Sequence, residues 1–179
     1  MPSSPALDSD GVLLVSIASE GTTLPGTYEI VSVEIETRLN RIGSATIVFN
    51  DGDMPNADFP LSSSDLLTPG KTLTISVGYG DTQNTLYTGV IVKHAIRIGA
   101  GNASRLVIEC KDKALAMTVG RKNACYVDMT DSDIITSLAG NCSGLSATVD
   151  ATTITYPELV QYHCSDWDFL LARAEANGM

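Results

Sequence analysis

The segment TLYTGVIVKHAIRIGAGNASRLVIEC, residues 85–110, determines the fold class. Apolar side chains recur at every second position before the glycine-rich GAGN, and again after it. The first run places on one face Leu86, Val90, Val92, His94, Ile96 and Ile98, and on the other Tyr87, Lys93 and Arg97. The second run alternates Leu106, Ile108 and Cys110 with Arg105, Val107 and Glu109. A period of two on both sides of a glycine-rich turn predicts an antiparallel β-hairpin.

Further alternating segments extend this hairpin into a larger sheet. They are YEIVSVEIETRL (28–39), RIGSATIVFND (41–51) and KTLTISVGYGD (71–81). In the first of them we expect Val31, Val33, Ile35 and Leu39 to face the core. Five or more antiparallel strands with little helix are typical of a barrel or a sandwich. The fold class is therefore mainly β with some α, an α+β protein built around an antiparallel β-barrel.

The expected domain organisation has three parts. Residues 1–12 are rich in Ser, Pro and Asp and predict a disordered or extended tail. Residues 13–118 form the antiparallel β-barrel, interrupted by a long loop at 54–71 that contains three prolines. Loops of such length are usually functional or interfacial. Residues 119–179 form a helix–strand–helix segment that links the barrel to whatever follows.

Local signals place the helices of this last segment. DKALAM (112–117) predicts a helical turn, and LSATVDATTITY (145–156) predicts one or two short strands. In TDSDIITSLAGN (130–141), Thr130 caps a helix and Asp133 occupies the capping-box position.

In the final helix, Ser165 is the expected N-cap, Asp166 and Asp168 lie in the first turn, and Gly178 occupies the C′ position. An apolar stripe at helical spacing comprises Trp167, Leu170, Leu171 and Ala174. If this stripe buries Trp167, its replacement by alanine would cost roughly 3 kcal/mol or more. Arg173 and Glu175 lie on the opposite face, where charged side chains are usually solvated.

The composition excludes several classes of function. With a formal net charge of −10, the 179-residue chain is unsuited to binding a nucleic-acid backbone or an anionic lipid surface. The acidity fits a partner surface that is basic. No signal peptide is recognisable at the N-terminus, and no apolar run is long enough to span a bilayer. We therefore expect assembly in the cytoplasm without stable membrane insertion.

The sequence offers little evidence for a catalytic or metal-binding site. His163 and Cys164 are neighbours in an expected strand and point to opposite faces, so they do not form a catalytic dyad. The four cysteines lack the local ligand pairs of a zinc site. The acidic turn at 51–58 lacks the full ligand set of a calcium loop. The sequence thus predicts no catalytic, cofactor-binding or metal site, and we expect that the protein is not an enzyme.

The last segment resembles the hub and spike proteins of contractile injection systems. These are the VgrG-type tip proteins of type VI secretion, the phage tail hub (late control protein D) family, and related phage-tail-like particles. The family pattern is a strand Q-[YF]-x-x-[ST]-D that runs into a helix D-F-[LI]-x-x-R-[AL]-E-x-x-G. The matching residues in this chain are Gln161, Tyr162, Ser165, Asp166, Trp167, Asp168, Phe169, Leu170, Arg173, Glu175 and Gly178.

This resemblance implies a structural role. In the family, two tube-like barrels per chain and three chains make a pseudo-hexameric ring, which adapts the hexameric tube to a trimeric spike. The implied partners are further copies of the chain in a trimer, the ring of tail-tube protein, and baseplate and spike-tip proteins. The implied location is the tip of a secreted or injected particle. The chain stops at Met179, where the family continues into a second barrel, so residues 119–179 resemble the incomplete start of the next hub module.

An alternative function is a ligand-binding β-module, such as a carbohydrate-binding or adhesin domain. It is suggested by the barrel-like pattern, by the long proline-containing loop, and by Tyr87 and Tyr126, which we expect to be exposed on this reading. A glycan-binding screen separates the two functions, because a structural hub protein should give no signal above background.

Overall fold

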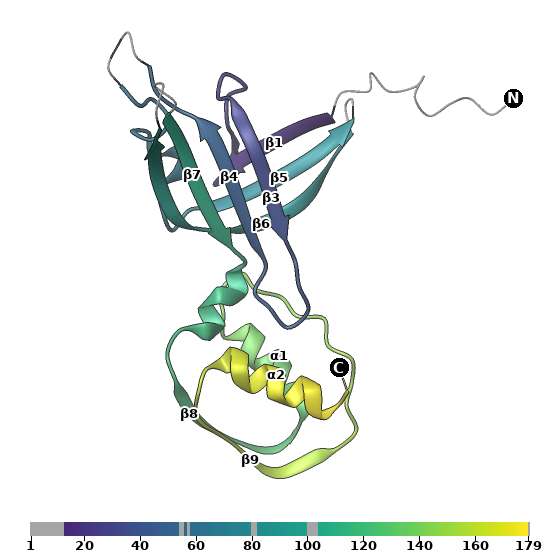
Figure 1. Ribbon diagram of the computed structural model, residues 1–179. Helices are drawn as coiled ribbons and strands as arrows, with labels where there is room; N and C mark the ends of the chain where they lie inside the picture. The colour runs from purple at the N-terminus through teal and green to yellow at the C-terminus, as the bar shows by residue number, and fades with distance from the viewer. Residues whose placement is uncertain (1–12, 54–55, 57, 80–81, 100–103, 179) are drawn as a thin grey trace, which may run out of the picture. The chain divides into compact units, whose positions relative to one another are not determined.

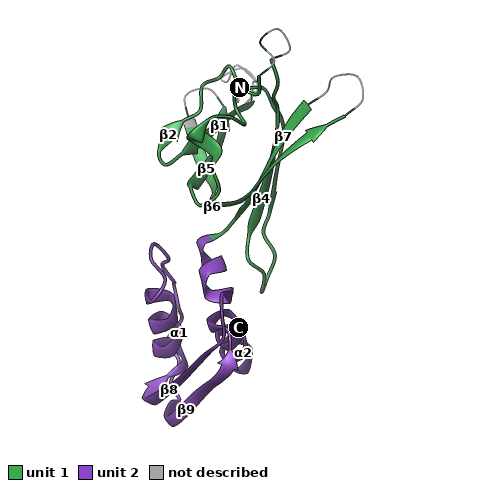
Figure 2. Ribbon diagram, turned by 90° about the vertical axis from the view of Figure 1, so that its left-hand side faces the viewer, with its two compact units in different colours: residues 1–112 green, residues 113–179 purple. Residues whose placement is uncertain are grey.

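The computed structural model describes residues 13–53, 56, 58–79, 82–99 and 104–178 (Figure 1). The expected tail at 1–12 lies outside these residues. The chain divides into two compact units, Met1–Asp112 and Lys113–Met179, which are coloured separately in Figure 2 and described separately below. The boundary expected from the sequence, residue 118, coincides with the last residue of a 3-10 helix, Lys113–Thr118, in the second unit.

The first unit is a seven-stranded antiparallel sheet with the strand order β2-β1-β5-β6-β7-β4-β3. The strands are β1 (Leu13–Ser19), β2 (Thr22–Thr23), β3 (Ile30–Glu36), β4 (Ser44–Asn50), β5 (Thr72–Tyr79), β6 (Thr82–Ile98) and β7 (Ser104–Lys111). The sheet curls strongly (Figure 2). The predicted hairpin of β6 and β7 and the mainly β, antiparallel fold class are both confirmed.

The curled sheet keeps two edges. Among the described residues, β3 pairs only with β4, and the first part of β1 pairs only with β5. No described strand joins β3 to β1 or β2, so backbone N–H and C=O groups at both edges lack a partner in the sheet. Such edges are able to pair with strands of another chain.

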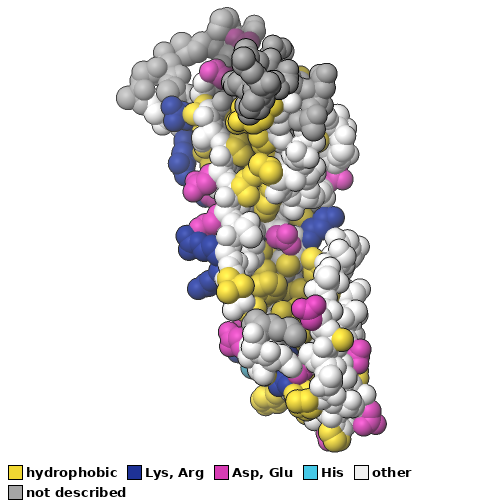
Figure 3. Space-filling model, turned by 90° about the vertical axis from the view of Figure 1, so that its right-hand side faces the viewer, with side chains coloured by type: hydrophobic (Ala, Val, Ile, Leu, Met, Phe, Trp, Pro, Cys, Tyr) yellow, Lys and Arg dark blue, Asp and Glu magenta, His cyan; other side chains and the backbone are white. Residues whose placement is uncertain are grey.

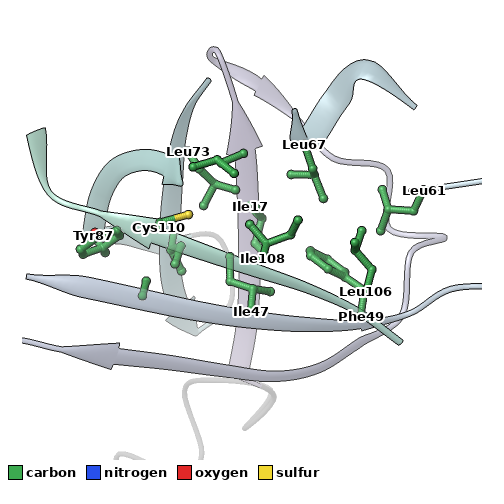
Figure 4. Close-up of a cluster of buried hydrophobic side chains, with 13 residues drawn as sticks. Ile17, Ile47, Phe49, Leu61, Leu67, Leu73, Tyr87, Leu106, Ile108 and Cys110 are labelled. Carbon is green, nitrogen blue, oxygen red and sulfur yellow. The ribbon is translucent and has the colours of Figure 1, made fainter. Parts of the chain in front are cut away.

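The core of the first unit lies on the concave side of the sheet (Figure 4). Its buried members are Ile17, Ala45, Ile47, Phe49, Leu61, Leu67, Leu73, Ile75, Tyr87, Ile91, Leu106, Ile108 and Cys110. Leu61 and Leu67 come from the long loop, and both are fully buried. The Asp51 carboxylate holds this loop in place, because it accepts backbone N–H bonds from Leu61 at 3.1 Å and Ser62 at 2.8 Å. The loop therefore completes the core.

The faces predicted for β6 are wrong along its first half. Tyr87 and Ile91 are buried at 7% and 1% exposure, whereas Leu86 is 58% exposed. The register with β7 shifts between Ile91 and Lys93, which inserts Val92 as an extra residue. A bulge of this kind exchanges the two faces of a strand. A second shift, in the register with β5 between Ile75 and Ser76, leaves Leu86 as an extra residue, so Tyr87 and Ile91 are the core residues of the stretch between the two bulges.

A second bulge changes the prediction for β3. The register with β4 shifts between Ile30 and Ser32, so Ile30 packs against the core and Val31 is 41% exposed. Val33 and Ile35 pack against the core as expected. Leu39 follows the end of the strand and is 89% exposed, so its predicted burial is wrong.

Gly89 allows the Tyr87 ring to lie against β6. A Cβ atom at position 89 would stand 2.5 Å from both the Lys111 carbonyl oxygen and the Tyr87 hydroxyl oxygen. We expect Gly89→Ala to lower the free energy of unfolding of the first unit by about 1–3 kcal/mol, because neither the strand nor the packed ring has room to move. Denaturant unfolding followed by far-UV circular dichroism measures the change.

The matched control for this prediction is Gly26→Ala in the same unit. No atom lies within 4 Å of the Cβ position of Gly26, and its backbone is not in the left-handed region. We expect the control to leave stability within about 0.5 kcal/mol of the parent, as is usual for surface substitutions. Equal stability of the two variants would contradict the packing explanation.

The second unit wraps a two-stranded ribbon around two helices (Figure 1). The ribbon strands are β8 (Lys122–Thr130) and β9 (Thr155–Cys164), and the helices are α1 (Asp131–Gly140) and α2 (Asp166–Ala176). Met117, Ile134, Leu138 and Phe169 are the buried centre of a second core. The predicted helical turn is present as Lys113–Thr118. The strands predicted within 145–154 are absent, and strand structure begins only at Thr155.

Both helix starts follow the local sequence signals. The Thr130 side chain accepts the Asp133 N–H, and the Asp133 carboxylate accepts the Thr130 N–H, so the predicted capping box is confirmed. Ser165 caps α2 by accepting the Asp168 N–H at 3.0 Å. Gly178 follows α2 with a φ of +71°, the conformation expected at C′.

Candidate functional site

The end of β9 and the start of α2 form a polar junction around Asp166, whose side chain is 2% exposed. Its Oδ2 accepts from Lys122 Nζ at 2.5 Å, and its Oδ1 accepts from Gln161 Nε2 at 3.0 Å. The hydrogen bond between Lys122 and Asp166 is the main reason that the pKa of Lys122 is raised. Gln161, itself 1% exposed, also accepts from the Tyr126 hydroxyl at 3.1 Å. Asp166 therefore joins both ribbon strands to α2. The sequence alone predicts only that it stabilises the first turn of the helix.

A second polar junction joins the two helices. Arg173 on α2 donates through Nε and Nη2 to the two carboxylate oxygens of Asp131, at 2.6 and 2.9 Å. Asn177 Nδ2 donates to Asp131 Oδ2 at 2.8 Å. The Asp131 side chain is 1% exposed and that of Arg173 is 17% exposed. The expectation that Arg173 is simply solvated is therefore wrong.

The electrostatics of this junction favour the ionised pair. The Arg173 hydrogen bond, followed by that of Asn177, lowers the pKa of Asp131 against the opposing effect of burial. The guanidinium carbon also lies 4.9 Å from the centre of the Tyr156 ring, a cation–π contact supplied by β9. The bidentate geometry ties α2 to the first residue of α1, while Tyr156 extends the contact to the ribbon.

The apolar side of α2 differs from the predicted stripe. Phe169 is its buried residue, at 8% exposure, and its ring stacks on Tyr126 with ring centres 5.7 Å apart. Trp167 and Leu170 are only partly buried where they pack against the same core. The predicted apolar stripe, which centres on Trp167, therefore omits Phe169, the most deeply buried apolar residue of α2.

The other residues of the sequence motif are at the surface or in caps. Tyr162 is 79% exposed on the outside of β9, and Glu175 and Gly178 are exposed at the end of α2. Asp168 accepts from the Ser165 hydroxyl at 2.7 Å, in addition to its backbone contact with Ser165. The motif thus combines a buried polar junction, a helix cap and one exposed aromatic side chain.

The geometry offers no assembled reaction centre around His163 and Cys164. His163 is exposed, adopts a φ of +46° and donates its backbone N–H to Asn123 Oδ1 at 2.8 Å, whereas Cys164 packs toward the second core. Within the part of the chain that the structure describes, no group of three His, Cys, Asp or Glu side chains is placed to hold a metal ion. No helix in the described ranges has the length and apolar character needed to cross a membrane.

A recess of about 620 Å³ opens at one end of the curled sheet. Its walls include Tyr28, Glu29, Asn50 and Arg105. The aromatic residues that suggested a ligand-binding module are elsewhere: Tyr87 is buried in the first core, and Tyr126 is half-buried against Gln161 and Phe169. Their predicted exposure is wrong, and the alternative function loses one of the three features that suggested it.

Comparison with known proteins identifies a sequence family and a shared fold. The sequence model of the family described as the Alg8 N-terminal domain matches residues 9–179. No curated protein matches in sequence. A component of the Escherichia coli type VI secretion system, c3393, which is described as structurally similar to the bacteriophage T4 tail proteins gp27 and gp5, superposes with a TM-score of 0.64 at 16% identity, over 88% of this chain and 42% of that protein.

Two phage-type tail proteins show the same fold. The 43 kDa tail protein of prophage MuSo2 from Shewanella oneidensis gives a TM-score of 0.67 at 11% identity, over 93% of this chain and 49% of that one. A tail protein from Neisseria meningitidis MC58 gives 0.62 at 17% identity, over 93% and 46%. The resemblance to VgrG-type and phage tail hub proteins is therefore confirmed at the level of the fold. The chain spans less than half the length of these solved proteins.

Proposed function

This chain belongs to the family of the Alg8 N-terminal domain, and from that premise we propose that it is a structural hub or spike component of a contractile injection apparatus. One observation carries the proposal: the curled sheet and the ribbon–helix unit together match tail proteins and a type VI secretion component over about nine-tenths of the chain. The apparatus is of the type VI secretion, VgrG-like or phage-tail-like kind. In it, the chain acts by assembly and not by catalysis.

The proposed task is adaptation of a hexameric tube to a trimeric spike. The two edges of the curled sheet that no described strand covers support this task, because strands of neighbouring subunits are able to add to them by main-chain hydrogen bonds. The proposed partners are further copies of the chain, the tail-tube ring, and baseplate and spike-tip proteins. The proposed location is the tip of a particle that is assembled in the cytoplasm and then secreted or injected.

Binding to the tube protein tests this function. The protein is purified, its mass in solution is measured, and it is passed over immobilised tube protein from the same gene neighbourhood. We expect retention of the protein together with self-assembly. A protein that remains monomeric and shows no affinity for the tube would exclude the hub function. Specific retention of a glycan by the same preparation would instead favour a ligand-binding module.

A further inference from the structure

The outer face of the first unit carries an uncompensated pair of like charges. Arg97 on β6 and Arg105 on β7 are directly opposite in the antiparallel register, and both are exposed. Opposed like charges destabilise a sheet. Although the chain has 21 acidic residues against 11 Lys and Arg, neither arginine makes an ion pair within the described residues. The turn sequence between the two strands, GAGNA (99–103), contains no carboxylate.

The surroundings of the pair are polar, and the recess that Arg105 lines also contains Glu29 and Asp51, neither of which forms an ion pair with it. Asn50 on β4 lies opposite Arg105, which forms a row of three hydrogen-bond donors across three strands. Further along the same strands, Lys93 bonds Glu109 at 2.6 Å, so that pair is already neutralised. Figure 3 shows Lys and Arg side chains along one edge of the sheet unit, with Asp and Glu side chains between them. The arginine pair is thus a local positive site on a protein with a net charge of −10.

The ribbon of the second unit presents a face of complementary chemistry. The outer side of β8 and β9 exposes Val127 (59%), Val160 (54%) and Tyr162 (79%). Glu158 lies opposite Val127 on this face, and among the described residues its carboxylate accepts only the weak Cys125 thiol bond at 3.4 Å. Apart from Lys122, neither ribbon strand contains Lys or Arg.

We propose that the Arg97–Arg105 pair of one copy binds the Glu158–Tyr162 face of the ribbon of a second copy. A guanidinium matches a carboxylate by paired hydrogen bonds and stacks on an aromatic ring, so the ribbon face offers both kinds of contact that arginine makes best. The Glu158 carboxylate relieves the repulsion within the arginine pair, and the exposed apolar side chains lose contact with water.

The charge pattern also determines the symmetry of the contact. A twofold contact of the arginine face with itself would bring four guanidinium groups together, so this face must meet a different surface on its neighbour. Such head-to-tail contacts close into rings when the rotation permits. The inference rests on the proposed function for the use of such a ring, but the contact itself is a property of the isolated chain.

Self-association of the purified chain provides the test, with sedimentation equilibrium as the measurement. We expect oligomers at about 0.05 M salt that weaken at about 0.5 M salt, where charges are screened over a much shorter distance. R97E/R105E should raise the apparent Kd about tenfold or more. The control R38E/R41E makes the same change in net charge on two exposed arginines elsewhere in the sheet unit. Arg38 pairs with the exposed Glu36, a surface contact that contributes little, and the control should leave the Kd within about twofold.

A charge exchange tests the assigned partner face. R105E and E158R should each weaken association, and R105E/E158R together should restore part of it, which is the signature of a direct pair in a double-mutant cycle. All the altered residues are exposed, and unchanged circular dichroism confirms the fold.

Three results would overturn the inference. They are a monomeric parent chain, an R97E/R105E variant that associates like its control, or an exchange that restores nothing. If the parent still binds the tube protein in any of these cases, the hub function stands and only this contact is wrong.

Discussion

Replacement of Arg173 by alanine is expected to lower the free energy of unfolding of the second unit by about 3–5 kcal/mol, the usual cost of breaking a buried ion pair by removing one partner. Asp131 is 1% exposed and would remain as a buried carboxylate held by Asn177 without a compensating cation. Trp167 is the only tryptophan in the chain and packs against the second core, so its fluorescence during denaturant unfolding reports on this unit alone.

The effect of Arg173→Ala should depend on pH. Since the pKa of Asp131 is lowered in the folded protein, the ionised pair stabilises the parent fully above the unfolded pKa of about 3.9. That contribution is lost as the pH falls through the lower, folded pKa. In the variant, protonation relieves the buried charge, so the stability difference should shrink from pH 7 towards pH 3. A difference that is constant across this range would show that Arg173 acts by packing alone.

The control for this prediction lies on the same helix. Glu175 is exposed and makes no ion pair within the described residues, so Glu175→Ala should change stability by less than about 0.5 kcal/mol. An equal loss in both variants would mean that any substitution near the end of α2 unfolds the helix, and would remove the ion pair as the cause.

Replacement of Phe169 by alanine is expected to cost about 3–4 kcal/mol, because a buried ring is lost and the second core cannot fill the space. The loss includes the stack of Phe169 on Tyr126. Trp167→Ala should cost clearly less, about half as much, because Trp167 is only partly buried. The cost of roughly 3 kcal/mol or more expected from the sequence for Trp167→Ala was conditional on its burial, which is only partial.

The comparison requires a probe that survives both substitutions. Far-UV circular dichroism follows the helices in either variant, whereas Trp167 fluorescence is available only in Phe169→Ala. A larger loss for Trp167→Ala than for Phe169→Ala would show that the tryptophan, and not the phenylalanine, anchors α2.

The features that the sequence predicted correctly are local. The caps at Thr130 and Ser165 depend on residues three positions away, and the short-range rules of helix starts are strong. The β6–β7 hairpin was equally clear, because alternation on both sides of a glycine-rich turn has few other interpretations.

The errors arise where one extra residue changes the period. The bulge at Val92 moved Tyr87 from an expected surface position into the core, and the bulge at Val31 moved Ile30 inward. Apolar residues on both faces of these strands hide such shifts, because alternation alone cannot show which face is buried.

The candidate site was predictable only in part. Ser165 and Asp168 were recognisable from local spacing, but Asp131 lies 42 positions before Arg173, and Lys122 lies 44 before Asp166. Nothing in a charged residue on a helix face indicates a partner at such a distance. The burial of Asp131 and Asp166 depends on the tertiary fold, which a single sequence does not reveal through spacing.

The strand order of the first unit has a consequence for its synthesis. β1 finds its main partner only in β5, and β4 finds its second partner only in β7. A ribosome therefore releases the earliest apolar strands long before the sheet is able to accept them, and pairings so distant in sequence form slowly. Until Lys111 has emerged from the ribosome, the nascent chain exposes unpaired apolar segments, to which chaperones and neighbouring nascent chains are able to bind.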